Sequence, residues 1–237
     1  MLVLALDTSS AAGSAAVIRG DRVLVERAGD ASRTHGERLP RELMAVLDAA
    51  RVDLREIDHF AVSIGPGSFT GLRVGIATIQ GLAFAQNKLV VPVSSFEASV
   101  FPVDGHAPPC DATAVWIDAH RGEVFAALYD AGRRELAGPT SLKPGATLDA
   151  WSPALARFDR IRFAGDAAAL YRDLIAARVG ERATIDTAPS PLAGRIGLIA
   201  AAAPARGVVP HAVVPLYVRR PDAVLARERR ADSSEPR

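Results

Sequence analysis

Residues 63–75 read S-I-G-P-G-S-F-T-G-L-R-V-G and join an apolar run to a long segment rich in alanine and glycine. A strand, a glycine turn and a helix are the usual parts of a phosphate-binding loop. However, both nucleotide-loop templates require glycine at the sixth position counted from Gly65, where Thr70 stands, and no lysine is near. We therefore interpret Gly65-Pro66-Gly67 as a sharp turn and Ser68 as the N-cap of a helix. A phosphate loop is the alternative.

Two further glycines lie inside this predicted helix. Gly71 and Gly75 each cost ~1 kcal/mol relative to alanine, so something should offset them. At about 100° per residue they share one face with three other residues, Thr78, Leu82 and Ala85. Such a strip of small residues lets a neighbouring helix or strand come close. Because the helix is apolar nearly all round, we expect burial on one side by its own sheet and on another by an intrachain helix or a second subunit.

The remaining pattern alternates strands and helices. Thr34 and Glu37 have the spacing of a capping box, and Pro40 predicts that the regular helix begins near Leu39. The first half is expected to hold strands at 2–6, 13–19, 22–27, 57–64 and 89–93, and helices at 39–50, 69–86 and 94–101. This order is typical of ribonuclease-H-like and actin-like ATPase lobes, an analogy of fold that does not determine function.

The second half begins as the first does. The turn formers of residues 104–111 mark a boundary, after which a strand at 112–117 ends in Asp118 and a partner follows at 123–129. A strand at 161–164 and helices at 167–178 and 192–203 complete the pattern. The fold class predicted is α/β, with two ribonuclease-H-like lobes of the actin-like ATPase (ASKHA) fold, each a mixed sheet with helices. The expected division is an N-terminal lobe at 1–103, a C-terminal lobe at 104–221 and a disordered tail at 222–237.

Composition restricts the class of protein. The 237 residues include 28 basic and 27 acidic side chains, a net charge of +1, which predicts no strong attraction to nucleic acid or a membrane. Cys110 is the only cysteine, so an intramolecular disulfide is excluded. No stretch approaches the roughly 20 apolar residues of a membrane helix. We expect a cytoplasmic protein.

Few residues are candidates for chemistry. Asp7, Thr8 and Ser9 follow the first strand, where an actin-like lobe has its first phosphate loop, but that loop usually reads D-x-G-[ST] and Ser9 replaces its glycine. The corresponding turn, Asp118–Gly122, also lacks paired glycines. Both are weak nucleotide candidates, and strand-end turns are the alternative. No two of the five histidines are three or four residues apart, and no nucleophile–base pair is recognisable. We expect no catalytic residue and no metal ligand.

Several segments together resemble one family. They are L-A-L-D-T-S at 4–9, T-H-G-E-R-L-P at 34–40, G-P-G-S-F-T-G-L-R-V-G at 65–75, D-A-H-R-G-E-V-F at 118–125 and P-L-Y-V-R at 215–219. These resemble the bacterial TsaB (YeaZ) proteins, partners of TsaD in the threonylcarbamoyl modification of adenosine 37 of tRNA. The resemblance implies a non-catalytic dimerisation subunit of the complex that modifies N6 of that adenosine in tRNAs reading codons that start with A.

The resemblance also implies partners. They are a TsaD-type paralogue in a heterodimer, a TsaE-type ATPase, a second copy when the chain is alone, and tRNA met through the complex; no membrane is involved. ATP and metal are expected in partner subunits and no cofactor in this chain. TsaD proteins have an H-x-x-x-H metal motif after the fifth strand, where this sequence has Ser95 and Ser99. The expected partner interface lies on the two long helices and consists of His35, Leu39, Glu42, Leu43, Val46, Gly71, Gly75, Thr78, Leu82 and Ala85.

Two other functions remain open. One is an autonomous ATP-dependent enzyme of the actin-like superfamily, and the other is a glycoprotease-type metallopeptidase, for which the sequence offers no zinc ligands. Under the interface hypothesis, replacing Gly75 with leucine should weaken pairing without unfolding the lobe.

Overall fold

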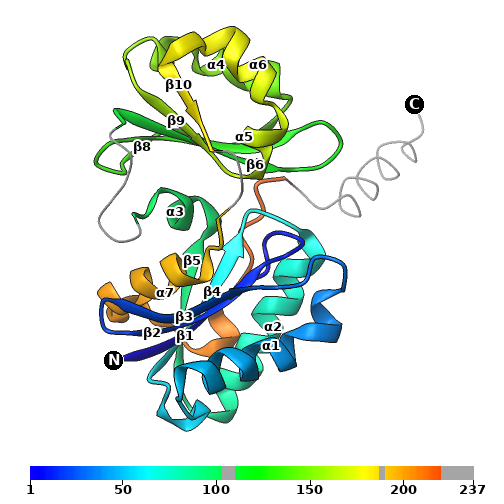
Figure 1. The fold of residues 1–237 in the computed structure, drawn as a ribbon, viewed down its shortest axis with the longest axis vertical. Coiled ribbons are helices and arrows are strands. Elements are labelled where there is room, and N and C mark those ends of the chain that lie inside the picture. The colour runs from blue at the N-terminus through cyan, green and yellow to red at the C-terminus, as the bar shows by residue number, and fades with distance from the viewer. Residues whose placement is uncertain (103–109, 187–189, 220–237) are drawn as a thin grey trace, which may run out of the picture.

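The computed structural model describes residues 1–102, 110–186 and 190–219, and most of the 104–111 boundary and the whole 222–237 tail lie outside these ranges. The chain forms two lobes, one above the other in Figure 1, each built on a mixed sheet with helices. This confirms the predicted fold class.

The first lobe is built on a sheet of order β3-β2-β1-β4-β5. β1 pairs antiparallel with β2 and parallel with β4, so the opening hairpin continues into a parallel half. The strands are β1 (Leu2–Asp7), β2 (Ser14–Arg19), β3 (Arg22–Ala28), β4 (His59–Gly65) and β5 (Leu89–Ser94). The helices between them are α1 (His35–Ala50), η1 (Leu54–Glu56), α2 (Phe69–Ala85) and α3 (Ser95–Val100).

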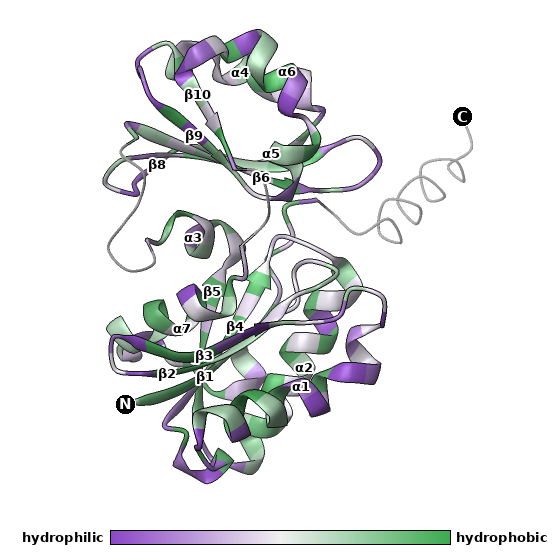
Figure 2. Cartoon of the chain, viewed as in Figure 1, coloured by the Kyte–Doolittle hydropathy of each residue, from purple (hydrophilic) through white to green (hydrophobic). Residues whose placement is uncertain are grey.

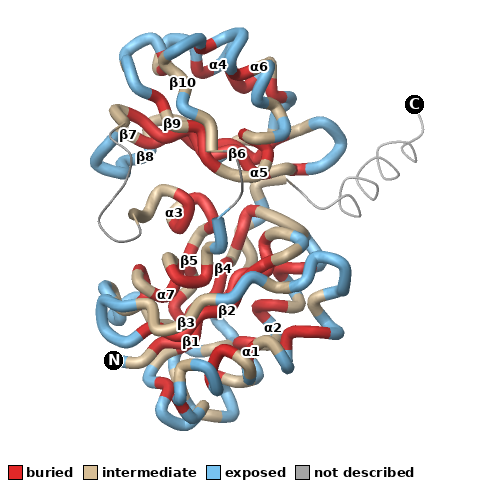
Figure 3. The backbone as a smooth tube through the Cα atoms, viewed as in Figure 1, coloured by how far each residue is buried: buried red, intermediate tan, exposed pale blue. Residues whose placement is uncertain are grey.

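Successive side chains of the central strand are buried on opposite faces of the sheet, as the twofold period of a strand requires. Leu4 and Leu6 join the core beneath α1 and α2, whereas Val3 and Ala5 pack with helix α7 (Ala193–Ala202) on the other face. Figure 3 shows the strands β1, β2 and β4 mostly in red, the colour of buried residues. Both faces are covered, so β1 reads as a continuous apolar run.

The second lobe repeats this topology. Its sheet has the order β10-β9-β6-β7-β8, with β6 antiparallel to β7 and parallel to β9. The strands are β6 (Ala112–Asp118), β7 (Val124–Asp130), β8 (Glu135–Leu142), β9 (Ile161–Ala164) and β10 (Ala183–Ile185), and the helices are α4 (Pro144–Leu155), α5 (Asp166–Leu170), α6 (Arg172–Val179) and η2 (Gly180–Arg182). Read from β8 to β10, the second sheet matches the first strand for strand. The predicted duplication of a lobe is therefore confirmed.

The structure corrects the expected start of the first long helix. α1 begins at His35, directly after Thr34, and Pro40 lies inside it. Glu37 accepts a hydrogen bond from the Thr34 backbone at 2.9 Å, as in a capping box. Proline removes one backbone bond near the start of the helix, and the burial of Leu39 against the sheet core outweighs that loss.

The expected C-terminal lobe, 104–221, includes residues that pack on the first lobe. Residues 193–217 return there, where α7 covers one face of the first sheet and η3 (Pro204–Arg206) and η4 (Pro210–Ala212) follow. The predicted helix at 167–178 is divided into α5 and α6, and β8 and α4 were not predicted. Composition alone could not assign α7, because the contact that places it joins residues far apart in the chain.

The last described segment connects the two lobes. Leu216 donates from its backbone N–H to the Ile64 carbonyl at 2.7 Å, which attaches the segment to the first lobe. Three residues later, Arg219 binds Glu123 and the Ala119 carbonyl of the second lobe, each at 3.0 Å. The segment therefore contacts both lobes within four residues.

Candidate functional site

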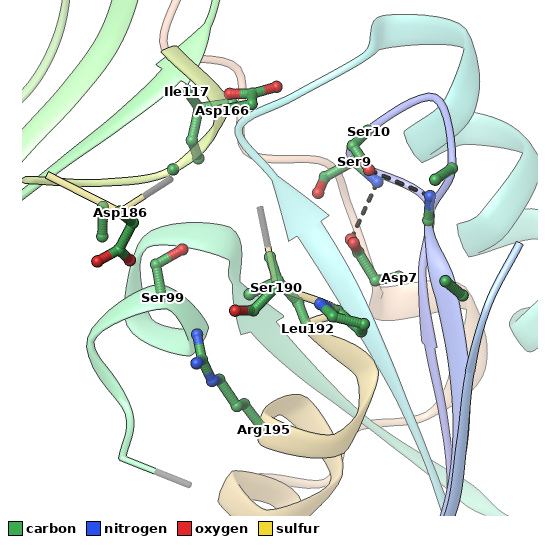
Figure 4. A pocket seen from close by; sticks show the side chains of 16 residues that line it. Asp7, Ser9, Ser10, Ser99, Ile117, Asp166, Asp186, Ser190, Leu192 and Arg195 are labelled. Carbon is green, nitrogen blue, oxygen red and sulfur yellow. Dashed lines mark hydrogen bonds between the residues drawn. The ribbon is translucent and has the colours of Figure 1, made fainter. Parts of the chain in front are cut away.

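A cavity of about 210 Å³ lies between the two lobes (Figure 4). The end of β1 and the loop after it, the start of α7 and the end of α3 form its lower wall. The ends of β6 and β9, the start of α5 and Asp186 form the upper wall. Ligands of open α/β folds bind at such strand ends, so this cavity is the first candidate site.

The structure separates the three weak nucleotide candidates. Asp7 and Ser9 line the cavity, and the Ser9 N–H donates to Asp7 Oδ1 at 3.0 Å. Thr8 points the other way, toward α2, and its buried hydroxyl has no hydrogen-bond partner in the described part of the chain. Burial raises the pKa of the Asp7 carboxyl above its ordinary value, although hydrogen bonds from Ser9 and Ser63 oppose the shift.

The upper wall contributes a second buried carboxyl. Asp166 accepts backbone hydrogen bonds from Asp118 and Ala167, each at 2.9 Å. Burial raises the pKa of Asp166, and the nearby charge of Asp118 acts in the same direction. Asp166 therefore links the start of α5 to the Asp118 turn that the sequence indicated.

Arg195 of α7 is the cation among the described lining residues. Its Nε is buried without a hydrogen-bond partner in the described ranges, and burial lowers the pKa of its guanidinium. The amides at the start of the same helix are already engaged, since Ala193 donates to Ser14 Oγ at 2.9 Å and Gly194 to Glu26 Oε1 at 2.8 Å. This helix start consequently has few donors left for an anion.

These residues do not fit a nucleotide triphosphate, the ligand that the actin-like fold implies. The charged lining residues are one arginine and three carboxylates, Asp7, Asp166 and Asp186. Asp186 is itself paired with Arg162 at 2.7 Å. Phosphate binding relies on several free N–H donors and cations, whereas the described lining side chains offer one cation, Arg195, against three carboxylates.

The glycine turn of residues 65–67 packs against the loop after β1. Gly65 has a φ of 102°, and a Cβ at Gly67 would overlap Ser9. The Ser68 N–H donates to the Ser9 carbonyl at 2.7 Å, and the Ser68 hydroxyl accepts from Gly71 N at 3.2 Å. The predicted turn and N-cap are confirmed. The turn therefore supports the cavity wall on the side that faces away from the cavity.

Ser95 and Ser99, which stand in the two histidine positions of the TsaD-type H-x-x-x-H metal motif, make hydrogen bonds within the first lobe. Ser95 Oγ lies 2.8 Å from Ser63 Oγ, and Ser99 Oγ donates to the Ser95 carbonyl at 2.7 Å. Within the described ranges, no three or more histidine, cysteine, aspartate or glutamate side chains are grouped so that they could hold a metal ion. The described helices also include none that is long and apolar enough to cross a membrane.

A second feature is an apolar groove between α1 and α2. Pro40, Met44, Ala77, Gly81 and Leu82 lie along it, and Met44 is 52% exposed. Figure 2 shows apolar residues on both helices, on the side of the lobe away from α7. An exposed groove of this composition between two helices is typical of a protein-binding surface.

The structure places the ten predicted interface residues in four ways. Leu39, Leu43 and Val46 are buried in the chain's own core, although Leu43 also reaches the groove. His35, Glu42, Gly71 and Gly75 make intrachain contacts described below. Thr78 and Leu82 line the groove, and Ala85 is exposed. The interface assignment itself stays a prediction, and helical spacing did not indicate which face of its helix each residue occupies.

Sequence reasoning missed Arg38. It is 3% exposed and its guanidinium binds both carboxylate oxygens of Glu42, at 2.7 and 2.6 Å. The unusual burial of an arginine cannot be read from a helical pattern in which position 38 adjoins Leu39.

The chain is similar to proteins named for the threonylcarbamoyladenosine modification of tRNA and to uncharacterised proteins. Residues 28–224 match a family model described as "TsaD: tRNA N6-adenosine threonylcarbamoyltransferase". The tRNA threonylcarbamoyladenosine biosynthesis protein TsaB of Bacillus subtilis is 28% identical over 94% of this chain and 96% of its own length. An uncharacterised Mycobacterium leprae protein is 34% identical, and the match covers 94% of this chain and 56% of that protein. The solved structure of YeaZ from Pseudomonas aeruginosa has a TM-score of 0.73 and 30% identity, over 91% of this chain and 99% of that one.

Proposed function

Because the chain belongs to the TsaB (YeaZ) family, we propose that it takes part in the threonylcarbamoyladenosine modification of tRNA as a non-catalytic subunit that pairs with a TsaD-type catalytic protein. The observation that carries this proposal is the groove between α1 and α2, an apolar surface outside the interlobe cavity. The donor set of the cavity, which does not fit a nucleotide, supports a role without catalysis.

Gly81, one of the residues that line the groove, bears on how closely a partner could approach it. Gly71, Gly75, Gly194 and Gly197 lie within helices against neighbours that a Cβ would meet, whereas a Cβ at Gly81 would meet nothing within 4 Å. Gly36 and Gly145 are also open, but they lie in the first turns of their helices. Glycine in a helix interior costs ~1 kcal/mol. No contact within the described chain offsets that cost at Gly81, which supports the close approach of a partner there.

Under this proposal, a TsaD-type protein covers the groove in the complex and a second copy covers it when the chain is alone. ATP and metal belong to the partner subunits, and a TsaE-type ATPase and tRNA join through the complex. An obligate role of this kind predicts that modification stops when the chain is omitted, although the chain has no activity of its own.

The test is co-purification with the TsaD-type protein of the same organism, followed by a tRNA-modification assay in which each subunit is omitted in turn. Ala77→Asp places a charge in the groove and should abolish both pairing and modification. Ala150→Asp, an exposed alanine on α4, is the matched control and should leave both unchanged. Pairing that survives Ala77→Asp would reject the groove as the interface.

The alternative is an autonomous ATP-dependent enzyme. Calorimetric titration of the isolated chain with ATP and magnesium distinguishes the two functions, because the enzyme hypothesis requires binding near micromolar concentrations. Heat of binding at that level would favour the enzyme over the subunit.

A further inference from the structure

The loop from Ser9 to Gly13 walls the interlobe cavity, yet its backbone is held mainly by α1. Ser9, Ser10, Ala12 and Gly13 line the cavity. The carbonyls of Ser10, Ala11 and Ala12 accept hydrogen bonds from α1 side chains, and the loop lies between β1 and β2, outside both strands. Its local stability therefore depends on the position of that helix.

Arg38 makes most of these bonds. Its Nη2 donates to the Ala11 carbonyl at 2.9 Å and to the Ala12 carbonyl at 2.5 Å, while Nη1 binds the Glu42 carboxylate. Its Nε donates to the Arg33 carbonyl at 3.3 Å. The planar guanidinium thus binds the cavity loop on one side and its own helix on the other.

His35 adds a second attachment from the same helix. Arg38 Nη2 lies 2.8 Å from His35 Nδ1, and His35 Nε2 lies 3.0 Å from the Ser10 carbonyl. A guanidinium can only donate, so Nδ1 accepts and the proton of the neutral ring is on Nε2, where it donates to Ser10. Arg38 and His35 are hereafter called the brace.

α2 supports the residue just before the loop. The missing side chains of Gly71 and Gly75 make room for Thr8, because a Cβ at Gly71 would overlap the Thr8 carbonyl and one at Gly75 the Thr8 hydroxyl. The same added Cβ at Gly71 would also lie 3.2 Å from the His35 ring. Both helices that form the groove therefore contact the strand end and loop that wall the cavity.

We propose that the brace makes the outer groove and the interlobe cavity parts of one coupled unit, so that pairing through α1 and α2 stiffens the Ser9–Gly13 loop. The inference rests on the proposed function, since it requires a partner at the groove. Covering the exposed side of α1 restricts local opening of its first turns, and the brace transmits that restriction to the loop. Coupling is reciprocal, so a molecule that orders the loop from the cavity side would strengthen pairing by the same factor.

Amide hydrogen exchange on the full chain tests the coupling. Exchange at residues 10–13 is compared between the chain alone and its complex with the TsaD-type protein, with the second-lobe turn 131–134 as an internal reference. We expect pairing to slow exchange at 10–13 by about 5- to 150-fold, the range of ordinary coupling energies, and to leave the reference unchanged.

Arg38→Lys identifies the brace as the connection. A lysine ammonium has three donors at one point and cannot span Glu42 and both loop carbonyls, so this variant should still pair but show little slowing at 10–13. Arg41→Lys, at an exposed position of the same helix, is the matched control and should behave as the wild type. Equal slowing in the Arg38→Lys complex would overturn the assignment to the brace.

The outcomes separate the two proposals. A wild-type complex that forms without slower exchange at 10–13 overturns the coupling and leaves the proposed function intact. Failure of the wild-type chain to form any complex overturns the proposed function, and the coupling with it. If Arg38→Lys does not fold, the wild-type comparison still decides whether pairing and the loop are coupled.

Discussion

A Cβ atom at Gly75 would overlap the side chain of Thr8, so the close contact between α2 and Thr8 within the chain requires glycine at this position. This corrects the expectation that Gly75→Leu would weaken pairing and leave the lobe folded. We predict that Gly75→Ala lowers the free energy of unfolding of the isolated chain by about 1–3 kcal/mol, the usual cost of overpacking. Chemical denaturation measures this loss.

The Thr8 contact can be isolated by a double mutant. Thr8→Ala removes the two atoms nearest to the added methyl group, so it should restore part of the stability lost in Gly75→Ala. Additive effects of the two substitutions would contradict this explanation.

Gly81 should behave in the opposite way. Its Cβ position is open, so Gly81→Ala is expected to stabilise the isolated chain by ~1 kcal/mol through helix propensity. The same methyl group should weaken pairing if a partner approaches the groove closely. Thermal unfolding of the free chain and a titration with the TsaD-type protein give the two values, and unchanged affinity would remove Gly81 from the interface.

Acidification should weaken the brace through His35. Burial and the neighbouring Arg38 lower the pKa of His35 below its ordinary value of 6.5, whereas the Ser10 carbonyl, Asp7 and Glu42 oppose this shift. The unfolded chain therefore binds the proton more readily, and this contribution to stability is complete above about pH 6.5 and declines as the pH falls below it.

The measurement is the free energy of unfolding against pH, compared between the wild type and His35→Gln. Burial raises the pKa values of Asp7, Glu26 and Asp166, and raised carboxyl pKa values make stability increase as the pH falls through them, so they oppose the histidine effect. The difference between the two proteins isolates His35. An identical slope below pH 6.5 in both would show that the ring does not titrate as expected.

Arg219 should matter for the lobe connection more than for global stability. It is partly exposed where it binds Glu123, so Arg219→Met is expected to cost less than about 1 kcal/mol of unfolding free energy. Amide exchange at Leu216, whose N–H binds Ile64, should accelerate in the same variant. Unchanged exchange at Leu216 would mean that the segment is held by its other contacts alone.

Much of the fold could be predicted because the relevant signals are local. The hairpin of β2 and β3 follows from two apolar runs around Gly20, and the turn into α2 follows from residues 65–68. Helix α7 was predicted as a helix but assigned to the wrong lobe. The residues that it packs against, Val3 and Ala5, are almost two hundred positions away, and no local pattern indicates so distant a contact.

The features of the cavity and of the groove also divide into those that the sequence predicted and those that only the structure revealed. The sequence by itself determined the order of the strands and long helices in the first lobe, the duplicated lobe and the two helices that form the groove, because strand and helix periods are properties of short segments. Only the tertiary structure decided that Thr8 turns to α2, that Arg38 binds the cavity loop and that Gly75 faces inward while Gly81 faces open space. These assignments depend on which face of a helix meets which loop, and packing between distant segments determines that face.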